Sequence, residues 1–467
     1  MSHPYDIAVI GAGSAGFSAA ITAADAGAQV ALIGHGTIGG ACVNVGCVPS
    51  KTLIRAVEAL HVARSASRFD GITASARLTS WKAVVRQKQK LIENLRQAKY
   101  SDLLPDYDAI TYLKGAAAFL FNGSLGVNGK TIGAKNIIIA TGSRPALPSI
   151  AGIENVPYLT STTALELRSL PASMIVIGAG YIGAEMAQMF ARAGVRVTLV
   201  SRRGLLPQAE PEVGETLTGC FEDEAISVVS GITYERIEKS GNKVKLHVNG
   251  TTGPRAITAE KVMIATGRAP NTEKLNLAAA GIETNANAGI KVDAQMRTTK
   301  KGVYAAGDVT GKDQFVYMAA YGAKIAAKNA MSGDALAYDN SIMPAVVFTD
   351  PQVASVGYTE IQARAAGFAV KTSTLTLDNV PRALAARNTS GLIKLIADIK
   401  TKKLLGAHIL APEGADSIQT AALAIRAGMT YEDLGAMIFP YLTTVEGLKL
   451  AAQAFDMDVG KLSCCAG

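Results

Sequence analysis

The hydrophobic pattern near the N-terminus predicts a strand, a glycine turn, a helix and a second strand. The apolar run 7–10 leads into Gly11-x-Gly13-x-x-Gly16, and an alanine-rich helical stretch is followed by the apolar run 30–33. In this context the glycines permit a tight turn and let a pyrophosphate approach backbone N–H groups at the start of the helix. We therefore expect a dinucleotide on this turn.

The same pattern recurs at 174–203, where Gly178, Gly180 and Gly183 form a second glycine turn. Two such units predict two bound dinucleotides, each at the edge of a parallel sheet. The later apolar runs that end in ATG, and the run 302–311 with its Gly-Asp pair, read as further strands of these units.

Both units lack the acidic residue that commonly binds the adenosine ribose at the end of the second strand. The first unit has Gly34-His35-Gly36 there, so backbone groups or another side chain must bind the ribose. The second unit has Arg202 and Arg203, which accommodate a 2′-phosphate, so NADPH is favoured over NADH.

The pattern changes beyond about residue 338 and predicts a third domain of the α+β type. Alternation in 391–410 indicates two strands around a basic turn, and 418–427 and 447–455 have helical spacing. The fold class expected is α/β, with two Rossmann-like domains followed by this smaller domain.

Composition narrows the function. With 467 residues, of which 49% are hydrophobic and 18% charged, the chain has material for several cores. No apolar run approaches the roughly 20 residues of a membrane span, and a strand pattern follows the first residues at once, so we expect a cytoplasmic protein without stable membrane association. The net charge of +8 is dispersed, which does not favour nucleic-acid binding.

The candidate chemistry lies in the cysteines, of which there are five. Cys42 and Cys47 stand in a glycine-rich segment before a helix that we expect to open at Ser50, where a helix N-terminus favours thiolate. A zinc half-site would need a second cysteine pair or a histidine cluster, so a redox-active disulfide fits better. Cys220 reads as core packing, and Cys464 and Cys465 end the chain in KLSCCAG.

The segment GGACVNVGCVPSK at 39–51, with both glycine turns, the two ATG strands and the YAAGD strand, resembles the pyridine nucleotide–disulfide oxidoreductase family over essentially the whole chain. The resemblance implies a glutathione-reductase-like fold, FAD on the first unit, NADPH on the second, and a homodimer whose active sites are shared between subunits. The implied boundaries are 1–147 and 272–336 for the FAD-binding domain, 148–271 for the NADPH-binding domain and 337–467 for the dimerisation domain.

The resemblance also implies roles for individual residues. Cys47 would lie nearest the flavin as the charge-transfer thiolate, with Cys42 as the outer, exchanging thiol. Lys51 would sit beside the isoalloxazine and pair with Glu185, and Asp308 would bind the ribityl chain. Backbone that lines the flavin is expected near Gly36, Ala41, Ala117 and Val316.

One motif departs from the family. Disulfide-reducing members carry a histidine near the C-terminus in HPTxxE, and here the stretch reads FPYLTTVE. Thr443 and Glu446 keep their register, but Tyr441 stands in place of the histidine. A phenol with a pKa of about 10 is a poor proton shuttle at neutral pH. The family resemblance adds Tyr100 as a second active-site phenol, opposite Tyr441.

The missing histidine and the terminal Cys464–Cys465 pair have one explanation. A soft metal ion as substrate needs thiolates that bind it and pass it on, and it brings no leaving thiol that requires a proton. We expect Cys464 and Cys465 to take Hg(II) from thiol complexes and to deliver it to Cys42 and Cys47. The expected reaction is Hg(II) + NADPH → Hg(0) + NADP⁺ + H⁺, a mercury detoxification.

Two further readings of the function remain at this point. A thioredoxin-reductase-like enzyme also ends in a vicinal redox pair, although such enzymes keep the histidine. A mercury-sequestering protein would bind Hg(II) without releasing vapour, although it would need no electron relay. Many relatives also carry an N-terminal metal-trafficking domain, and the chain resembles the catalytic core without it.

Overall fold

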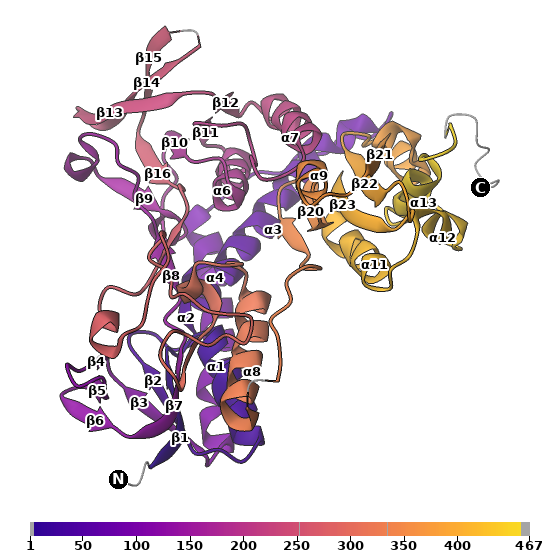
Figure 1. Ribbon diagram of the computed structural model, residues 1–467. Coiled ribbons are helices and arrows are strands. Elements are labelled where there is room, and N and C mark those ends of the chain that lie inside the picture. Colours follow the sequence, from indigo (N-terminus) through magenta and orange to yellow (C-terminus); the bar gives the residue numbers. More distant parts are fainter. Residues whose placement is uncertain (1–3, 252, 334, 459–467) are drawn as a thin grey trace. The chain divides into compact units, whose positions relative to one another are not determined.

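The computed structural model describes residues 4–251, 253–333 and 335–458, and these divide into two compact units. The first unit is assembled from segments 4–52, 82–146 and 267–340, and the second from 53–81, 147–266 and 341–458. Each unit thus draws on segments far apart in the chain (Figure 1). The three domain boundaries expected from the sequence stay a prediction.

The first unit contains a five-stranded parallel sheet in the order β18-β7-β1-β2-β3. Its strands are rich in Ile, Val and Ala because both faces of the central strands are covered. The strand bounds are β1 (Tyr5–Ile10), β2 (Val30–Gly34), β3 (Ile110–Lys114), β7 (Ala134–Ile139) and β18 (Val303–Ala305).

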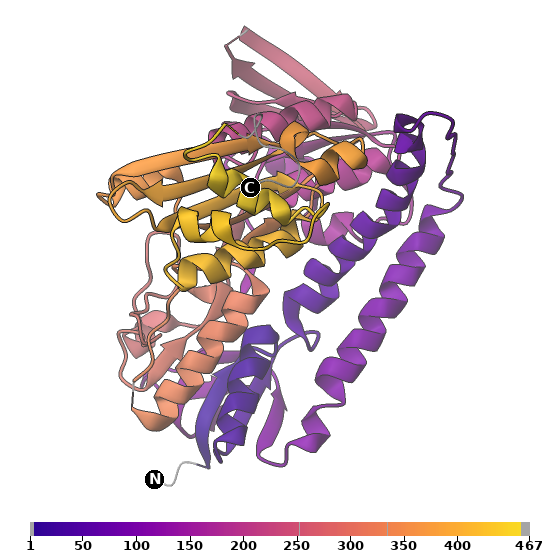
Figure 2. The same cartoon turned by 90° about the vertical axis from the view of Figure 1, so that its right-hand side faces the viewer.

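One face of this sheet is covered by helices α1 (Ser14–Asp25) and α8 (Val316–Ser332). Both helices present buried alanines to the same core, and small side chains let helix backbones approach closely. Figure 2 shows the two helices side by side, α1 in indigo and α8 in orange. The other face is covered by β4 (Ala117–Phe119), β5 (Leu125–Val127) and the segment around Leu275.

The remaining elements of the first unit include a three-stranded antiparallel sheet and a short strand pair. Their bounds are α2 (Gly40–Val45), β6 (Lys130–Ile132), β8 (Ser143–Pro145) and β17 (Arg268–Pro270). Helices α3 (Cys47–Arg64) and α4 (Trp81–Arg96) each contribute residues to both units.

The second unit contains a parallel sheet in the order β12-β11-β10-β16-β9 and an antiparallel sheet of three strands. Isoleucines and valines of both sheets meet in one core. The bounds are β9 (Tyr158–Thr160), β10 (Ser173–Ile177), β11 (Arg196–Val200), β12 (Ser227–Val229), β16 (Lys261–Ile264), β13 (Thr233–Ser240), β14 (Lys243–Gly250), β15 (Gly253–Ala259), α5 (Ser161–Ala164), α6 (Tyr181–Arg192) and α7 (Pro211–Asp223).

The same unit contains an antiparallel sheet in the order β19-β20-β23-β22-β21. Helix α11 packs on β20 and β23, and α13 packs on β21 and β22, so the α+β character expected of this region is confirmed. The bounds are β19 (Ala345–Val347), β20 (Gln352–Gly357), β21 (Val370–Thr376), β22 (Leu392–Asp398), β23 (Leu404–Ala411), α9 (Glu360–Ala365), α10 (Pro381–Ala385), α11 (Gly414–Arg426), α12 (Tyr431–Ala436) and α13 (Glu446–Gln453).

One boundary expected from the sequence was wrong. We placed the helix after the cysteine segment at Ser50, whereas α3 begins at Cys47. The first turn of α3 contains Pro49, which is tolerated there because the N–H that proline lacks has no partner in a first turn. Among the helices of the described residues, none combines the length and apolar character that crossing a bilayer requires.

Candidate functional site

The first glycine turn links β1 to α1, and its shape requires glycine. Gly11 has φ +123°, and a side chain there would overlap the carbonyl oxygen of Ala140. A side chain at Gly16 would overlap the carbonyl oxygen of Gly11. Gly13 caps α1 without a side-chain hydrogen bond. The first turn of α1 therefore keeps backbone N–H groups available for a phosphate.

The cysteine segment docks on this turn through glycine. The N–H of Gly39 donates to the carbonyl oxygen of Ala12 at 2.8 Å. A side chain at Gly40 would come within 2.6 Å of the Gly13 Cα. Two backbones therefore lie in direct contact, which brings α2, with Cys42, and the start of α3, with Cys47, beside the dinucleotide turn.

The two thiols of the predicted redox pair are in contact. The pKa of Cys42 is raised, first because its thiol hydrogen-bonds with Cys47 and then because it is buried. The positive charge of Lys51 opposes this shift, which places the ammonium within electrostatic reach of the pair. Lys51 lies one turn after Cys47 on α3. Three residues predicted to act together thus form one cluster.

Tyr100 belongs to the same neighbourhood. It lies in the helical turn Gln97–Ser101 after α4, and its ring packs edge-on against Phe17 with centroids 4.9 Å apart. Its hydroxyl and the Ser14 hydroxyl lie 3.2 Å apart. Burial raises the pKa of Tyr100, the hydrogen bond to Ser14 lowers it, and Cys42 and Cys47 raise it further. The phenol therefore lies near both the glycine turn and the thiols.

Asp308 follows β18 in the short helix Gly307–Thr310 and is held by two neighbours that the sequence did not indicate. The Ser143 hydroxyl donates to its carboxylate at 2.5 Å, and Arg268 lies 3.5 Å away. The Arg268 Nε also donates to the Ser143 hydroxyl at 2.7 Å. The carboxylate is thus fixed at the carboxyl end of the sheet, where a dinucleotide binds in such folds.

The other predicted flavin contacts lie at element ends in the first unit. Gly36 is an exposed left-handed turn residue after β2, with φ +86°. Ala41 lies in α2, Ala117 begins β4, and Val316 begins α8. Phe315 caps α8 without a side-chain hydrogen bond, so its first N–H groups are also available to a ligand.

The second glycine turn repeats the geometry of the first. Side chains at Gly178 and Gly183 would overlap the carbonyl oxygens of Ala265 and Gly178, respectively. Gly180 caps α6 without a side-chain hydrogen bond, and a side chain there would meet no described atom within 4 Å. Arg202 and Arg203 are exposed directly after β11. Arg202 also lowers the pKa of Tyr234, which burial raises to about 12.

Glu185 and Glu446 are buried carboxylates of the second unit with backbone partners. Glu185 accepts from the Phe348 N–H at 2.9 Å, and its pairing with Lys51 stays a prediction. Glu446 begins α13 and accepts from the Leu442 N–H at 3.1 Å. Tyr441 lies beside this contact and is 47% exposed. The predicted cysteines Cys464 and Cys465 lie outside the described residues.

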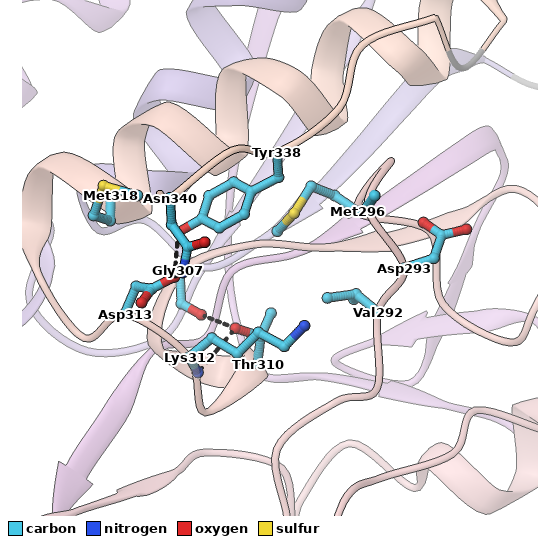
Figure 3. Close-up of a pocket in the computed structure, with 11 residues that line it drawn as sticks. Val292, Asp293, Met296, Gly307, Thr310, Lys312, Asp313, Met318, Tyr338 and Asn340 are labelled. Atoms are coloured by element: carbon cyan, nitrogen blue, oxygen red, sulfur yellow. Dashed lines mark hydrogen bonds between the residues drawn. The ribbon is translucent and has the colours of Figure 1, made fainter. Parts of the chain in front are cut away.

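A cavity of about 240 Å³ in the first unit is separate from the predicted residues. Figure 3 shows Tyr338 and Asn340 directed at Asp313, whose carboxylate accepts from both at 2.9 and 2.8 Å. The rest of the lining comprises Val292, Asp293, Ala294, Met296, Gly307, Thr310, Lys312 and Met318. Within the described ranges, no group of three or more His, Cys, Asp or Glu residues is placed to hold a metal ion.

Comparison with known proteins matches the whole chain. Residues 5–327 match the model of the pyridine nucleotide-disulphide oxidoreductase family, and residues 343–452 match the dimerisation domain of that family. A mercuric reductase from Lysinibacillus sphaericus is 47% identical over 99% of this chain and 85% of its own length. A mercuric reductase from Streptomyces lividans is 44% identical over 99% of this chain and 98% of its own.

Solved structures give the same likeness at lower identity. The Cu(II) complex of the HOCl-induced flavoprotein disulfide reductase RclA from Escherichia coli has a TM-score of 0.84 and 31% identity, over 97% of this chain and 99% of that one. A second structure of the HOCl-induced flavoprotein disulfide reductase RclA from Escherichia coli has a TM-score of 0.84 and 32% identity, over 96% of this chain and 99% of that one.

Proposed function

Because the chain belongs to the pyridine nucleotide-disulphide oxidoreductase family, we propose that it is a flavoenzyme that uses NADPH to reduce Hg(II) to elemental mercury. The observation that carries this proposal is the contact between Cys42 and Cys47 beside the first glycine turn. Relatives that align with nearly all of the chain are named mercuric reductase, which supports Hg(II) as the substrate. The assignment of single residues below belongs to the proposal.

The residues present fit both dinucleotides. The first and third glycines of each turn leave no room for side chains, and each turn ends at a helix without a side-chain cap, as the approach of a pyrophosphate requires. The first turn lies beside the thiols and would hold FAD, and exposed Arg202 and Arg203 would hold the 2′-phosphate of NADPH on the second. When bound, these cofactors would supply electrons in pairs: one pair opens the Cys42–Cys47 disulfide, and a further pair from another NADPH reduces the metal.

The chain's own contribution is to hold thiols where a soft cation can bind. Cys42 and Cys47 are close enough to hydrogen-bond, so both sulfurs can bind one Hg(II) ion. The raised pKa of Cys42 means that its thiol keeps a proton until the metal displaces it, and the Lys51 charge eases that loss. Binding therefore releases protons, and neutral or alkaline pH favours it.

Tyr441 in place of histidine fits a metal substrate better than a disulfide. A disulfide substrate leaves as a thiolate that needs a proton, whereas elemental mercury leaves without one. The hydrogen bond from Leu442 to buried Glu446 fixes the backbone that carries Tyr441. We place Cys464 and Cys465 as the pair that receives Hg(II) from thiol complexes and hands it to Cys42 and Cys47.

The assembly and the location complete the proposal. The match to the dimerisation domain supports a homodimer, and we infer that each active site combines residues of both subunits. Exposure of Tyr441 in the single chain agrees with a site that a partner completes. We place the enzyme in the cytoplasm, where NADPH is supplied.

The test is an anaerobic titration of the purified yellow protein, first with NADPH and then with Hg(II) in excess thiol, while vapour is trapped. Once the disulfide has been opened, we expect one mercury atom to leave the solution for each further NADPH oxidised. NADPH oxidation that does not respond to Hg(II), with rapid reduction of thioredoxin, oxidised glutathione or lipoamide, would instead show a disulfide reductase. Stoichiometric binding of Hg(II) without vapour would show a sequestering protein.

A further inference from the structure

The end of β2 leaves one subsite of the first dinucleotide without its usual group. A carboxylate at this position commonly binds the adenosine ribose, and Gly34 stands here instead. His35 and Thr37 are the polar side chains in the stretch 35–40 that follows, and both are exposed. The ribose hydroxyls therefore need a partner from elsewhere in the first unit.

Tyr112 reaches this position from the neighbouring strand. It lies on β3, where it pairs in register with Leu32 of β2. A side chain built on Gly34 would overlap the Tyr112 hydroxyl and would come within 2.9 Å of the Ala12 Cβ. The phenol hydroxyl thus lies over the backbone of Gly34, at the space that the first atoms of an acidic side chain would fill. Ala12 belongs to the glycine turn, so the hydroxyl faces the dinucleotide edge.

The Tyr112 hydroxyl is available to a ligand. No hydrogen bond to it is recorded within residues 4–251, 253–333 and 335–458, although its ring is half-buried against the α1 side of the sheet. Burial raises the pKa of Tyr112, so the group remains a neutral hydroxyl at physiological pH. A phenol can donate one hydrogen bond and accept another. It can therefore bind a ribose hydroxyl without a charge.

We propose that the Tyr112 hydroxyl binds the adenosine ribose of FAD in place of the missing carboxylate. The inference rests on the proposed function, because it takes FAD as the dinucleotide of the first unit. Gly34 and Tyr112 then act together, because the absence of a side chain at Gly34 on β2 makes room for the Tyr112 side chain from β3. A role as mere filler would need the ring but not the oxygen, so Phe would serve equally well.

The experiment measures FAD binding to the apoprotein by flavin fluorescence, independently of turnover. We expect Tyr112→Phe to weaken FAD about three- to tenfold, the effect of one lost hydrogen bond, while FMN, which has no adenosine, binds both proteins alike. His35→Ala is the matched control and should leave FAD binding unchanged. Equal FAD affinity of wild type and Tyr112→Phe, or a loss only in His35→Ala, would overturn the proposal.

A second measurement changes the ligand. FAD analogues that lack the 2′- or the 3′-hydroxyl of the adenosine ribose should bind the wild-type apoprotein more weakly, and at least one of them should bind Tyr112→Phe as well as FAD does. If the wild-type protein binds FAD and both analogues equally, the role of Tyr112 is contradicted, whereas the proposed function is not. Wild-type protein that binds no FAD would sink the proposed function instead.

The geometry also predicts a compensating pair of changes. Gly34→Glu alone should lose FAD, because the new side chain overlaps the Tyr112 hydroxyl. Gly34→Glu with Tyr112→Val should recover FAD binding, because the carboxylate then has space at the ribose. Failure of the double variant to bind more tightly than Gly34→Glu would contradict the placement of the ribose at this point.

Discussion

We propose that Tyr441 adapts the family's site to a metal substrate. The backbone that follows it is unusual, since Leu442 has φ +60° and donates its N–H to the carboxylate of Glu446. Thr443 adds a hydrogen bond from its hydroxyl to the Pro440 carbonyl oxygen at 2.8 Å. These two hydrogen bonds hold the turn that carries the Tyr441 phenol. We infer that it donates a hydrogen bond to thiolates during metal exchange.

Replacement of Tyr441 by Phe tests this role. We expect Hg(II)-dependent turnover to fall about 10- to 100-fold, the range for loss of a hydrogen bond to a charged group, while NADPH reduces the flavin at the same rate. Stopped-flow absorbance separates the two steps. Tyr358→Phe, at a tyrosine of similar exposure, is the control and should change neither. Equal turnover of Tyr441→Phe and wild type would remove Tyr441 from the site.

Single residues also show where sequence analysis stops. Cys42, Cys47 and Lys51 could be grouped because they lie within ten positions of each other. Ser143 and Arg268 could not, because they reach Asp308 only through the fold, across separations of 165 and 40 positions. Tyr112 was missed because a tyrosine on a strand carries no motif.

At the scale of elements, the two glycine turns make equal demands in both units. The third glycine of each turn contacts the first through backbone alone, and no rotamer change can relieve an overlap there. Helix propensity alone would favour Ala over Gly by about 1 kcal/mol at such positions. The steric term therefore opposes propensity and exceeds it.

The variants Gly183→Ala and Gly219→Ala separate the effect of steric overlap from that of helix propensity, since both glycines lie in helices of the second unit. A side chain at Gly219 would meet no described atom within 4 Å, so Ala there should stabilise the protein by about 0.5–1 kcal/mol. Ala at Gly183 should destabilise the protein and weaken NADPH binding. Denaturant unfolding and NADPH titration measure both effects. A Gly183→Ala protein as stable as Gly219→Ala would contradict the close contact.

A buried ionic cluster joins α7 to the C-terminal sheet. Lys394 on β22 is 2% exposed and contacts Glu210, Glu212 and Glu360 at 2.8, 2.8 and 3.1 Å. Burial acts to lower the pKa of Lys394, but its hydrogen bonds to the three carboxylates outweigh burial and raise it. The pKa of Glu360 is lowered by Arg364 and then by Lys394. Glu210 is also buried, so it depends on this cation.

Lys394→Met should lower the free energy of unfolding at pH 7 by about 3–5 kcal/mol, because it leaves a buried carboxylate without its partner. The lowered pKa values of Glu212 and Glu360 contribute stability that is complete above their ordinary value of 4.5 and is lost as pH falls through the lower folded values. The difference in the free energy of unfolding between Lys394→Met and wild type should therefore become smaller below pH 4.5. Urea unfolding across pH measures it, with exposed Lys243→Met as control.

The elements themselves were largely predictable where periodicity was strong. The buried strands β1, β2 and β10 follow from apolar runs beside glycine turns, and the hairpin β22–β23 follows from alternation around a basic turn. The start of α3 was expected three residues late, at Ser50 and not at Cys47. Local pattern thus predicts elements better than it predicts their ends.

The whole molecule depends on pairing distant segments. The sequence indicated two dinucleotide units and a third domain, and the family match confirms that organisation in outline. The first unit is completed by segment 267–340, which returns after the second unit has begun. No local sequence pattern indicates that a later segment rejoins the first unit, because the rejoining depends on which strand edges of the sheet are still unpaired. It was expected only through the family resemblance.

The terminal pair is best tested on the assembled enzyme. We expect Cys464→Ala with Cys465→Ala to leave flavin reduction by NADPH intact and to cut Hg(II) turnover at least tenfold when excess thiol competes for the metal, about 1.4 kcal/mol in the barrier. Vapour release at several thiol concentrations measures this loss. Cys220→Ala, a half-buried cysteine of α7, is the control. Turnover that is independent of both substitutions would show that metal enters by another route.

The contact of Gly40 with Gly13 limits how this enzyme can evolve. A side chain at Gly40 fits only if the Gly13 backbone moves away, so the cysteine segment and the glycine turn must change together or stay fixed. Lineages that acquire a new substrate are thus expected to vary at positions outside this backbone contact. Substrate specificity would then change through those positions, while the packing of the cysteine segment on the glycine turn stays the same.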